Sequence, residues 1–155
     1  MAIPKPRFSR RHLPRRLRRL IGEWRVVGQF VGGTKVLDVR GTATFRWLVK
    51  DALVVLRIRT TVAPWSTAIL GADDEANEFV MLYSDVRGVV RRYEVSLTAK
   101  RWIFWRRAPG FHQRSIARLA ANGRSMQVKW EKSVDGRKWL RDFNLTYVKR
   151  RRTGS

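Results

Sequence analysis

The chain has 155 residues, a formal net charge of +22, no cysteine and two histidines, His12 and His112. This length is typical of a single domain with a sizeable core, and 44% hydrophobic residues argue against disorder despite the charge. The lack of cysteine excludes a disulfide scaffold, a thiolate zinc site and a cysteine nucleophile. No apolar run approaches the roughly 18 residues of a membrane span, and no secretory signal is recognisable. We therefore expect a cytoplasmic protein without a metal or cofactor.

The positive charge is concentrated at the two ends of the chain. Residues 1–19 hold eight basic residues and no acidic one, residues 149–152 add four more, and the body keeps +10. Such tails attract RNA, another polyanion or an anionic membrane surface without reading a sequence. The alternative is that they are solvated tails of an arginine-rich chain. The predicted polyanion-binding residues are Arg10, Arg11, Arg15, Arg16, Arg18, Arg19, Arg150, Arg151 and Arg152.

In chain order, Pro4 and Pro6 predict a basic extended arm over residues 1–9. Leucines at 13, 17 and 20 then follow helical spacing, which predicts a short amphipathic helix over residues 10–21. This helix should cover one end of the structure that follows. A transit peptide is the less favoured interpretation, because Leu20 and Ile21 lead directly into a strand.

From residue 22 onward the chain alternates apolar and polar residues with a period of two. Val134-Asp135-Gly136-Arg137 joins two such runs, which is a strong hairpin signal. Met126, Val128 and Trp130 should share one face, and Trp139, Arg141, Phe143, Leu145 and Tyr147 should share one face of the next run. Glycine- and aspartate-containing turns separate further runs. The expected strands are 22–31, 36–49, 53–60, 67–72, 78–85, 89–97, 102–107, 111–120 and the two of the hairpin.

About ten strands at this spacing predict an all-β protein, an up-and-down antiparallel β-barrel with a short N-terminal helix. We expect the barrel with its helix to span residues 10–149 and a basic tail to span 150–155. Closure of the barrel would remove exposed strand edges. An open sandwich is the alternative architecture.

Several stretches resemble a group of lipocalin-like (calycin-type) bacterial domains of unknown function. They are Gly22-Glu23-Trp24, residues 71–74, MLYSDVRGVVRRYEVSL at 81–97, WRRAPGFHQR at 105–114 and WEKSVDGRKWLRDFNLTY at 130–147. The resemblance covers roughly residues 12–149 and implies a barrel with a cavity but no established reaction. The arginine load and the basic arm depart from that group. A related haem-binding barrel uses a histidine near its C-terminal end, and no histidine follows His112 here, so haem binding is not expected.

One face of each strand in a closed barrel points into the lumen. We predict that this face carries three arginines, two tyrosines and an amide among aromatic walls, which suits an apolar or amphiphilic, anionic ligand. The alternative is that the arginines pair with Asp85, Glu94 or Glu131, or extend outward. The predicted lumen residues are Trp24, Phe45, Arg57, Tyr83, Arg91, Tyr93, Arg106 and Gln113.

Nothing in the sequence identifies a catalytic site. The candidate acids and bases are Asp73, Asp74, Asp85, Glu131 and His112. Asp73 and Asp74 lie in an expected turn, Glu131 should be exposed because its parity is opposite to that of Trp130, and His112 follows a Pro-Gly turn at a barrel rim. An enzyme is therefore less favoured than a binding protein. The leading hypothesis is a small-molecule-binding barrel with a cavity lined by Arg57, Arg91 and Arg106. The second is an interaction module with a packed lumen, whose basic arms bind RNA or another polyanion with help from rim tryptophans Trp65, Trp102 or Trp105.

Overall fold

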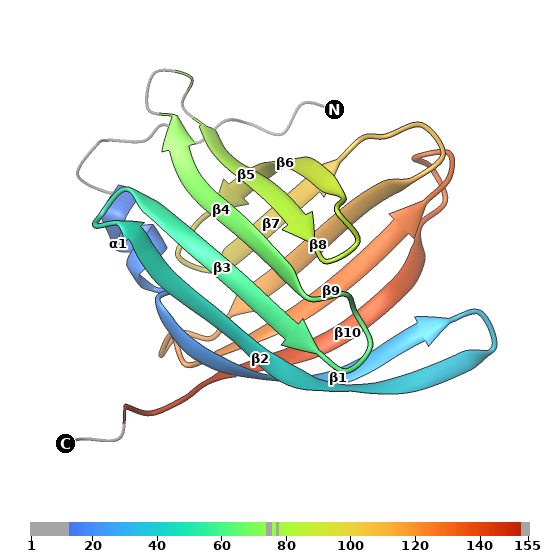
Figure 1. The fold of residues 1–155 in the computed structure, drawn as a ribbon, viewed down its shortest axis with the longest axis horizontal. Coiled ribbons are helices and arrows are strands. Elements are labelled where there is room, and N and C mark those ends of the chain that lie inside the picture. The colour runs from blue at the N-terminus through green and yellow to red at the C-terminus, as the bar shows by residue number, and fades with distance from the viewer. Residues whose placement is uncertain (1–12, 74–75, 77, 153–155) are drawn as a thin grey trace.

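The computed structural model describes residues 13–73, 76 and 78–152 and forms a closed antiparallel barrel of ten strands with one short helix (Figure 1). Each strand pairs with its neighbours in the sequence, and β10 pairs with β1 to close the barrel. The predicted up-and-down barrel is confirmed and the open sandwich is excluded. The elements are α1 (Leu13–Arg18), β1 (Gly22–Gly32), β2 (Lys35–Val49), β3 (Leu53–Thr60), β4 (Ser66–Asp73), β5 (Glu78–Asp85), β6 (Val90–Leu97), β7 (Arg101–Arg106), β8 (His112–Leu119), β9 (Ser125–Ser133) and β10 (Leu140–Lys149).

The strands form where period-2 alternation separates an inner from an outer face. In β8, Gln113, Ser115, Ala117 and Leu119 are buried, while the intervening side chains are more exposed. Residues paired across the sheet share a face, so the pairing registers extend this inner face around the barrel. Among the described residues, twenty-four buried hydrophobic side chains from α1, the turn after it and the strands form one continuous core.

A β-bulge in β10 corrects part of the hairpin prediction. The register shifts between Arg141 and Phe143, so Arg141 pairs with Glu131 on the outer face, whereas Phe143 pairs with Trp130. Trp139 precedes the bulge and lies outside, with the Arg114 guanidinium 4.0 Å from its ring centroid. The prediction that Trp139 and Arg141 share a face with Phe143 was therefore wrong.

The helix α1 covers one end of the barrel, as predicted. It ends at Arg18, shorter than the predicted 10–21, and residues 10–12 and the arm over 1–9 lie outside the described residues. Leu17 and Leu20 are completely buried at this end, and Trp24 Nε1 donates a 2.9 Å hydrogen bond to the Leu20 carbonyl. A six-residue helix has little stability alone, so its packing on the barrel must hold it in place.

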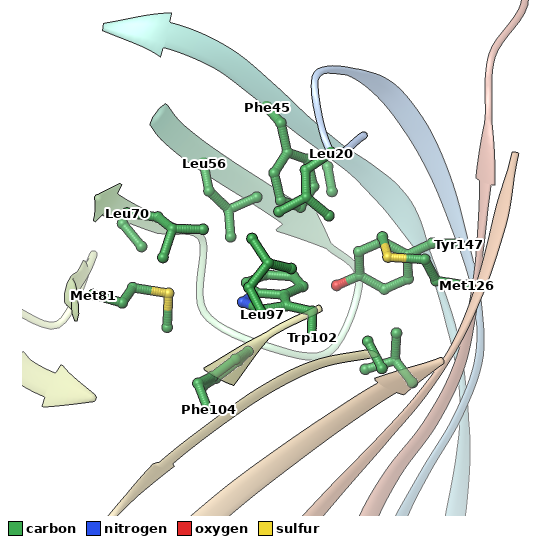
Figure 2. Packing of buried hydrophobic residues seen from close by; sticks show 14 of the residues in the cluster. Leu20, Phe45, Leu56, Leu70, Met81, Leu97, Trp102, Phe104, Met126 and Tyr147 are labelled. Carbon is green, nitrogen blue, oxygen red and sulfur yellow. The ribbon is translucent and has the colours of Figure 1, made fainter. Parts of the chain in front are cut away.

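Aromatic rings fill the half of the barrel next to α1. Phe45 lies edge-on to Trp24 and to Trp102, at centroid distances of 6.3 and 5.5 Å, and Trp102 contacts Phe104 at 5.1 Å. Figure 2 shows Phe45 and Trp102 close to Leu20, Leu97 and Tyr147 in the core. The predicted lumen residues Trp24 and Phe45 do point inward, and they are closely packed there.

We expect Gly41→Ala to destabilise the barrel strongly. A Cβ atom at Gly41 in β2 would lie 2.0 Å from the Arg59 carbonyl oxygen and 2.7 Å from the Thr60 Cα atom, both backbone atoms of β3. Separating these strands should cost about 3 kcal/mol of the free energy of unfolding, at the upper end for overpacking, measured by urea denaturation. As a control, Gly33→Ala meets no atom within 4 Å but keeps a φ of 62°, and should cost only about 1 kcal/mol. Equal losses would contradict the steric explanation.

Candidate functional site

The end of the barrel opposite α1 brings polar side chains from four adjacent strands together. The last residues of β5 and β7 and the first residues of β6 and β8 meet at this end. Their inward side chains form a group that we call the mouth cluster. It consists of Tyr83, Asp85, Arg91, Tyr93, Arg106 and Gln113.

Gln113 organises one half of the mouth cluster. Its Oε1 atom accepts hydrogen bonds from the Tyr93 hydroxyl at 2.9 Å and from Arg91 Nη1 at 3.1 Å. Arg106 is paired with Gln113 across β7 and β8. Burial raises the pKa of Tyr93, and the nearby positive charges of Arg91 and Arg106 oppose that rise. Two guanidinium groups therefore lie close to one buried, neutral phenol.

Asp85 organises the other half. Its buried carboxylate accepts hydrogen bonds from the Tyr83 hydroxyl at 2.8 Å and from Arg87 Nη2 at 2.8 Å, Nε at 3.1 Å and the backbone nitrogen at 2.9 Å. These bonds, those of Arg87 first, hold the pKa of Asp85 well below its usual range although burial opposes them. Burial and the bond to Asp85 raise the pKa of Tyr83. The Asp85 charge is thus neutralised by Arg87.

Within the described part of the chain, Arg91 and Arg106 have no carboxylate partner. Arg91 contacts Gln113 and lies over the Phe111 ring at 5.3 Å. Two further carboxylates lie near this end and have other partners. Glu131 binds Arg114 at 3.1 Å on the outer face. Asp142 is buried and contacts Lys132 at 3.7 Å, and Lys132 lies opposite Gln113 on the inner face. The alternative in which Asp85, Glu94 or Glu131 pairs with these arginines is not what the structure shows.

Aromatic side chains continue from the mouth cluster into the barrel. Tyr83 lies edge-on to Tyr93 at 6.0 Å, Tyr93 to Phe104 at 5.1 Å, and Phe104 to Trp130 at 4.9 Å. This wall is apolar except for the hydroxyl groups at its outer edge. It connects the charged rim with the packed half next to α1.

Two buried polar atoms along this wall have no hydrogen-bond partner in the described structure: Trp102 Nε1 and Ser115 Oγ. Both side chains are almost fully buried, with relative exposures of 3% and 1%. In Figure 2 the indole nitrogen of Trp102 lies on the side of the ring that faces Leu70 and Met81. Leaving a buried hydrogen-bonding group unpaired costs roughly 1–3 kcal/mol, so the position of these two groups is unfavourable unless each gains a partner.

The structure contradicts the prediction that Arg57 lines the lumen. In β3 the inner face carries Val54 and Leu56, and Arg57 is exposed on the outer face. It lines an outer hollow of about 210 Å³ with Thr42, Thr44, Arg46 and Arg59. A larger hollow of about 840 Å³ also lies largely on the outer face, between Leu53, Ile69 and Val80. The predicted cavity lined jointly by Arg57, Arg91 and Arg106 was therefore wrong, whereas Arg91 and Arg106 do come together.

The predicted polyanion-binding arginines divide into two groups. Some bind the barrel itself. Arg16 donates to the Leu97 carbonyl at 3.2 Å, and Arg19 donates to the carbonyls of Ala120 and Ala121 at 3.4 and 3.3 Å. Arg18 forms an ion pair with Asp51 at 2.9 Å, and Arg150 forms one with Glu23 at 2.6 Å. Arg15, Arg151 and Arg152 are exposed, and Arg10 and Arg11 lie outside the described residues. Much of the basic helix therefore serves to attach α1.

The groups considered for catalysis do not assemble into a site. Asp73 accepts a bond from the Ala76 backbone nitrogen at 3.0 Å in a turn, and the His112 ring lies beside Gly136. Over residues 13–73, 76 and 78–152, no three histidine or acidic side chains are grouped so as to hold a metal ion. The same residues include no helix with the length and hydropathy needed to cross a bilayer.

Closure, meander topology and an N-terminal helix over one end define a lipocalin-like barrel.

Two of the solved structures that share this fold illustrate the similarity. The crystal structure of Rv2717c from M. tuberculosis matches 87% of this chain and 95% of its own, with a TM-score of 0.63 and 12% identity. The S-type phycobiliprotein lyase CPES from Guillardia theta matches 89% and 92%, with a TM-score of 0.56 and 8% identity. No family model and no curated protein sequence matches the chain. Membership of the bacterial domain group remains a prediction.

Sequence reasoning missed the pairing of Asp85 with Arg87 and the unpaired donors Trp102 and Ser115. The inward parity of Asp85 was visible beside Tyr83, and Arg87 stands two residues later in a Val-Arg-Gly turn, which is a usable signal. Nothing in the sequence distinguishes Trp102 Nε1 from the satisfied indole nitrogen of Trp24.

We expect the stability contributed by Asp85 to disappear in acid. Because its pKa is below the unfolded value of about 3.9, the stabilisation is complete above about pH 5 and is lost as the pH falls through 4 and below. Asp85→Asn should lower the free energy of unfolding by roughly 1–3 kcal/mol at pH 7, and this difference should shrink steadily towards pH 3. Urea denaturation at several pH values measures it. Asp38→Asn, at an exposed carboxylate, should have little effect throughout. A difference independent of pH would refute the assigned role.

Proposed function

We propose that this barrel binds a small amphiphilic molecule at the end opposite α1, with a carboxylate or phosphate group held by Arg91 and Arg106. The observation that carries the proposal is that two inward, partly buried arginines meet at the mouth without a carboxylate partner in the described chain. Burying a guanidinium without a counter-charge is unfavourable. A ligand anion would supply that charge.

The chemistry of the mouth cluster suits such a group. Arginine presents a planar fork of donors that binds carboxylate and phosphate oxygens in pairs. The Tyr93 hydroxyl and Gln113 side chain are already bonded to each other, and Gln113 also fixes the position of Arg91. Because Asp85 is neutralised by Arg87, it does not repel an incoming anion. The cluster is thus arranged in advance for a negative headgroup.

The apolar part of the ligand would lie against the wall formed by Tyr83, Phe104 and Trp130. The half of the barrel beyond it is filled by Trp24, Phe45 and neighbouring side chains, so the ligand would occupy the outer half of the lumen. Trp102 Nε1 and Ser115 Oγ would meet the inner end of the ligand. Their unpaired hydrogen-bonding capacity favours a ligand with a second oxygen along its chain.

The structural neighbours support this proposal only in general terms. One of them is named as a phycobiliprotein lyase, so one barrel of this fold is an enzyme that acts on a phycobiliprotein. With 8% identity it specifies no ligand for this chain. The function proposed here rests on the mouth cluster and its charge.

Removing the two mouth arginines should selectively weaken binding of an anionic amphiphile. Hydrogen bonds to charged groups are worth about 1.5–3 kcal/mol, so Arg91→Gln with Arg106→Gln should weaken dodecanoate binding at least about tenfold. Binding of dodecan-1-ol should change little. Isothermal titration calorimetry with both probes measures the difference.

The matched control is Arg92→Gln with Arg107→Gln. These residues are the exposed sequence neighbours of the two mouth arginines, and the control removes the same net charge. It should leave dodecanoate binding unchanged. If both double variants lost affinity equally, general electrostatic attraction would explain the binding, and a wild-type protein that binds neither probe would sink the proposal.

Trp102→Phe tests the inner end of the site. A phenyl ring keeps most of the packing but lacks the indole N–H, and so removes the unpaired donor. Among hydroxydodecanoates with the hydroxyl at successive carbons, wild type should bind at least one isomer about fivefold more tightly than dodecanoate, as expected for one added hydrogen bond of about 1 kcal/mol. Trp102→Phe should abolish that preference, and Trp105→Phe, on the opposite face of β7, should retain it. If Trp102→Phe still preferred the same hydroxydodecanoate isomer, the Trp102 indole would not be part of the binding site.

A further inference from the structure

The outer face of β2 and β3 carries a hollow whose five lining residues all have a hydrogen-bond donor in the side chain. Its volume is about 210 Å³, and its lining consists of three arginines and two threonines. In the β2–β3 register Arg57 lies opposite Thr44, and Arg59 lies opposite Thr42. Arg46 stands next along β2. The strands thus place three guanidinium groups around one depression on the outside of the barrel, separate from the mouth cluster.

These three arginines have no acidic partner among residues 13–73, 76 and 78–152. The ion pairs of these described residues use other cations: Arg18, Arg87, Arg114, Lys132 and Arg150. The nearest acidic residue in the pairing register is Glu23 on β1, across Thr44, and its carboxylate is bound by Arg150 at 2.6 Å. The hollow is therefore a concentration of positive charge that the protein does not neutralise there.

An oxyanion matches both the charge and the size of this hollow. Residues two positions apart on a strand, such as Arg57 and Arg59, lie about 7 Å apart along it, so their charges repel at close range. A phosphate group between them would reduce that repulsion and accept from guanidinium and hydroxyl donors together. With about 30 Å³ for each water molecule in the liquid, the hollow has room for one phosphate group and its hydration.

An exposed tryptophan adjoins the hollow. The Arg59 guanidinium lies 4.9 Å from the Trp65 ring centroid, and Trp65 is 52% exposed. Arg25 on β1 is paired with Thr42 and extends the basic surface on the other side. Aromatic side chains beside a positively charged groove stack the bases of single-stranded nucleic acids. A free phosphate or a lipid headgroup has no flat ring to place on Trp65.

We infer that Arg46, Arg57 and Arg59 hold a backbone phosphate of a single-stranded nucleic acid while a neighbouring base stacks on Trp65. This outer-face site does not depend on the ligand proposed for the lumen. It differs from binding through the basic ends of the chain, because it places the contact on a rigid part of the barrel.

The test compares two triple variants of the full chain that lose equal charge. Binding of a fluorescent 12-nucleotide oligouridine is measured by anisotropy from 50 to 300 mM salt. Arg46→Gln, Arg57→Gln and Arg59→Gln together should weaken binding at least about tenfold at low salt and reduce the slope of log affinity against log salt by about 0.7 for each phosphate that is no longer neutralised. The control triple is Arg92→Gln, Arg101→Gln and Arg118→Gln, on the outer face of β6, β7 and β8, and should change affinity less than about twofold. Urea denaturation should show that both triples remain folded.

Trp65→Ala should weaken oligouridine binding about fivefold or more with an unchanged salt slope, because base stacking releases no counterions. Equal losses in the two triple variants would overturn the site. An effect of the arginine triple with none from Trp65→Ala would leave only a phosphate site and refute the nucleic-acid assignment. The nucleic-acid assignment would also be refuted if the protein bound phosphatidylserine vesicles through these arginines and did not bind oligouridine. Arg91→Gln with Arg106→Gln should not alter oligouridine binding. The outer-face site can therefore be tested independently of the ligand proposed for the lumen.

Discussion

The pairing of the first strand with the last is the constraint on which the rest of the structure depends. It runs from Trp24 opposite Lys149 to Phe30 opposite Phe143, and the Arg150 backbone nitrogen continues it with a 2.7 Å bond to the Glu23 carbonyl. Closure gives every strand two neighbours and divides its side chains between an enclosed and an outer face. Asp85, Tyr93 and Gln113 are therefore buried together at the mouth because they lie on the inner faces of their strands.

The sequence predicted the order, number and approximate bounds of the strands because alternation and turn residues are local signals. It was less successful where local signals conflict. In β3, Val54, Val55 and Leu56 are all buried, so either face looks apolar, and Arg57 was assigned to the wrong one. In β10 the bulge after Arg141 reverses the alternation, and neither a glycine nor a proline marks its place. A change of one residue in register exchanges the two faces completely.

The mouth cluster was predictable to the extent that it depends on parity. Tyr83, Arg91, Tyr93, Arg106 and Gln113 were expected to face inward, and they do, because their strands alternate without interruption. Strand parity alone does not tell which charges neutralise each other. That depends on the ends of turns, as where Arg87 folds back onto Asp85. The neighbours with 12% and 8% identity show that many sequences can form this barrel, so the chemistry of each lumen must be derived from its own side chains.

The arginines of α1 and its following turn have a mechanical consequence. Arg18 is bound to the β2–β3 turn at Asp51, Arg16 to the end of β6 at Leu97, and Arg19 to the β8–β9 turn at Ala120 and Ala121. Two turns and the end of one strand, spaced around the barrel, are thus all bonded to the same short segment. Strand ends joined in this way cannot spread apart independently. Breathing motions of the barrel, and any exchange of molecules between the interior and solvent, would then be concentrated at the opposite rim.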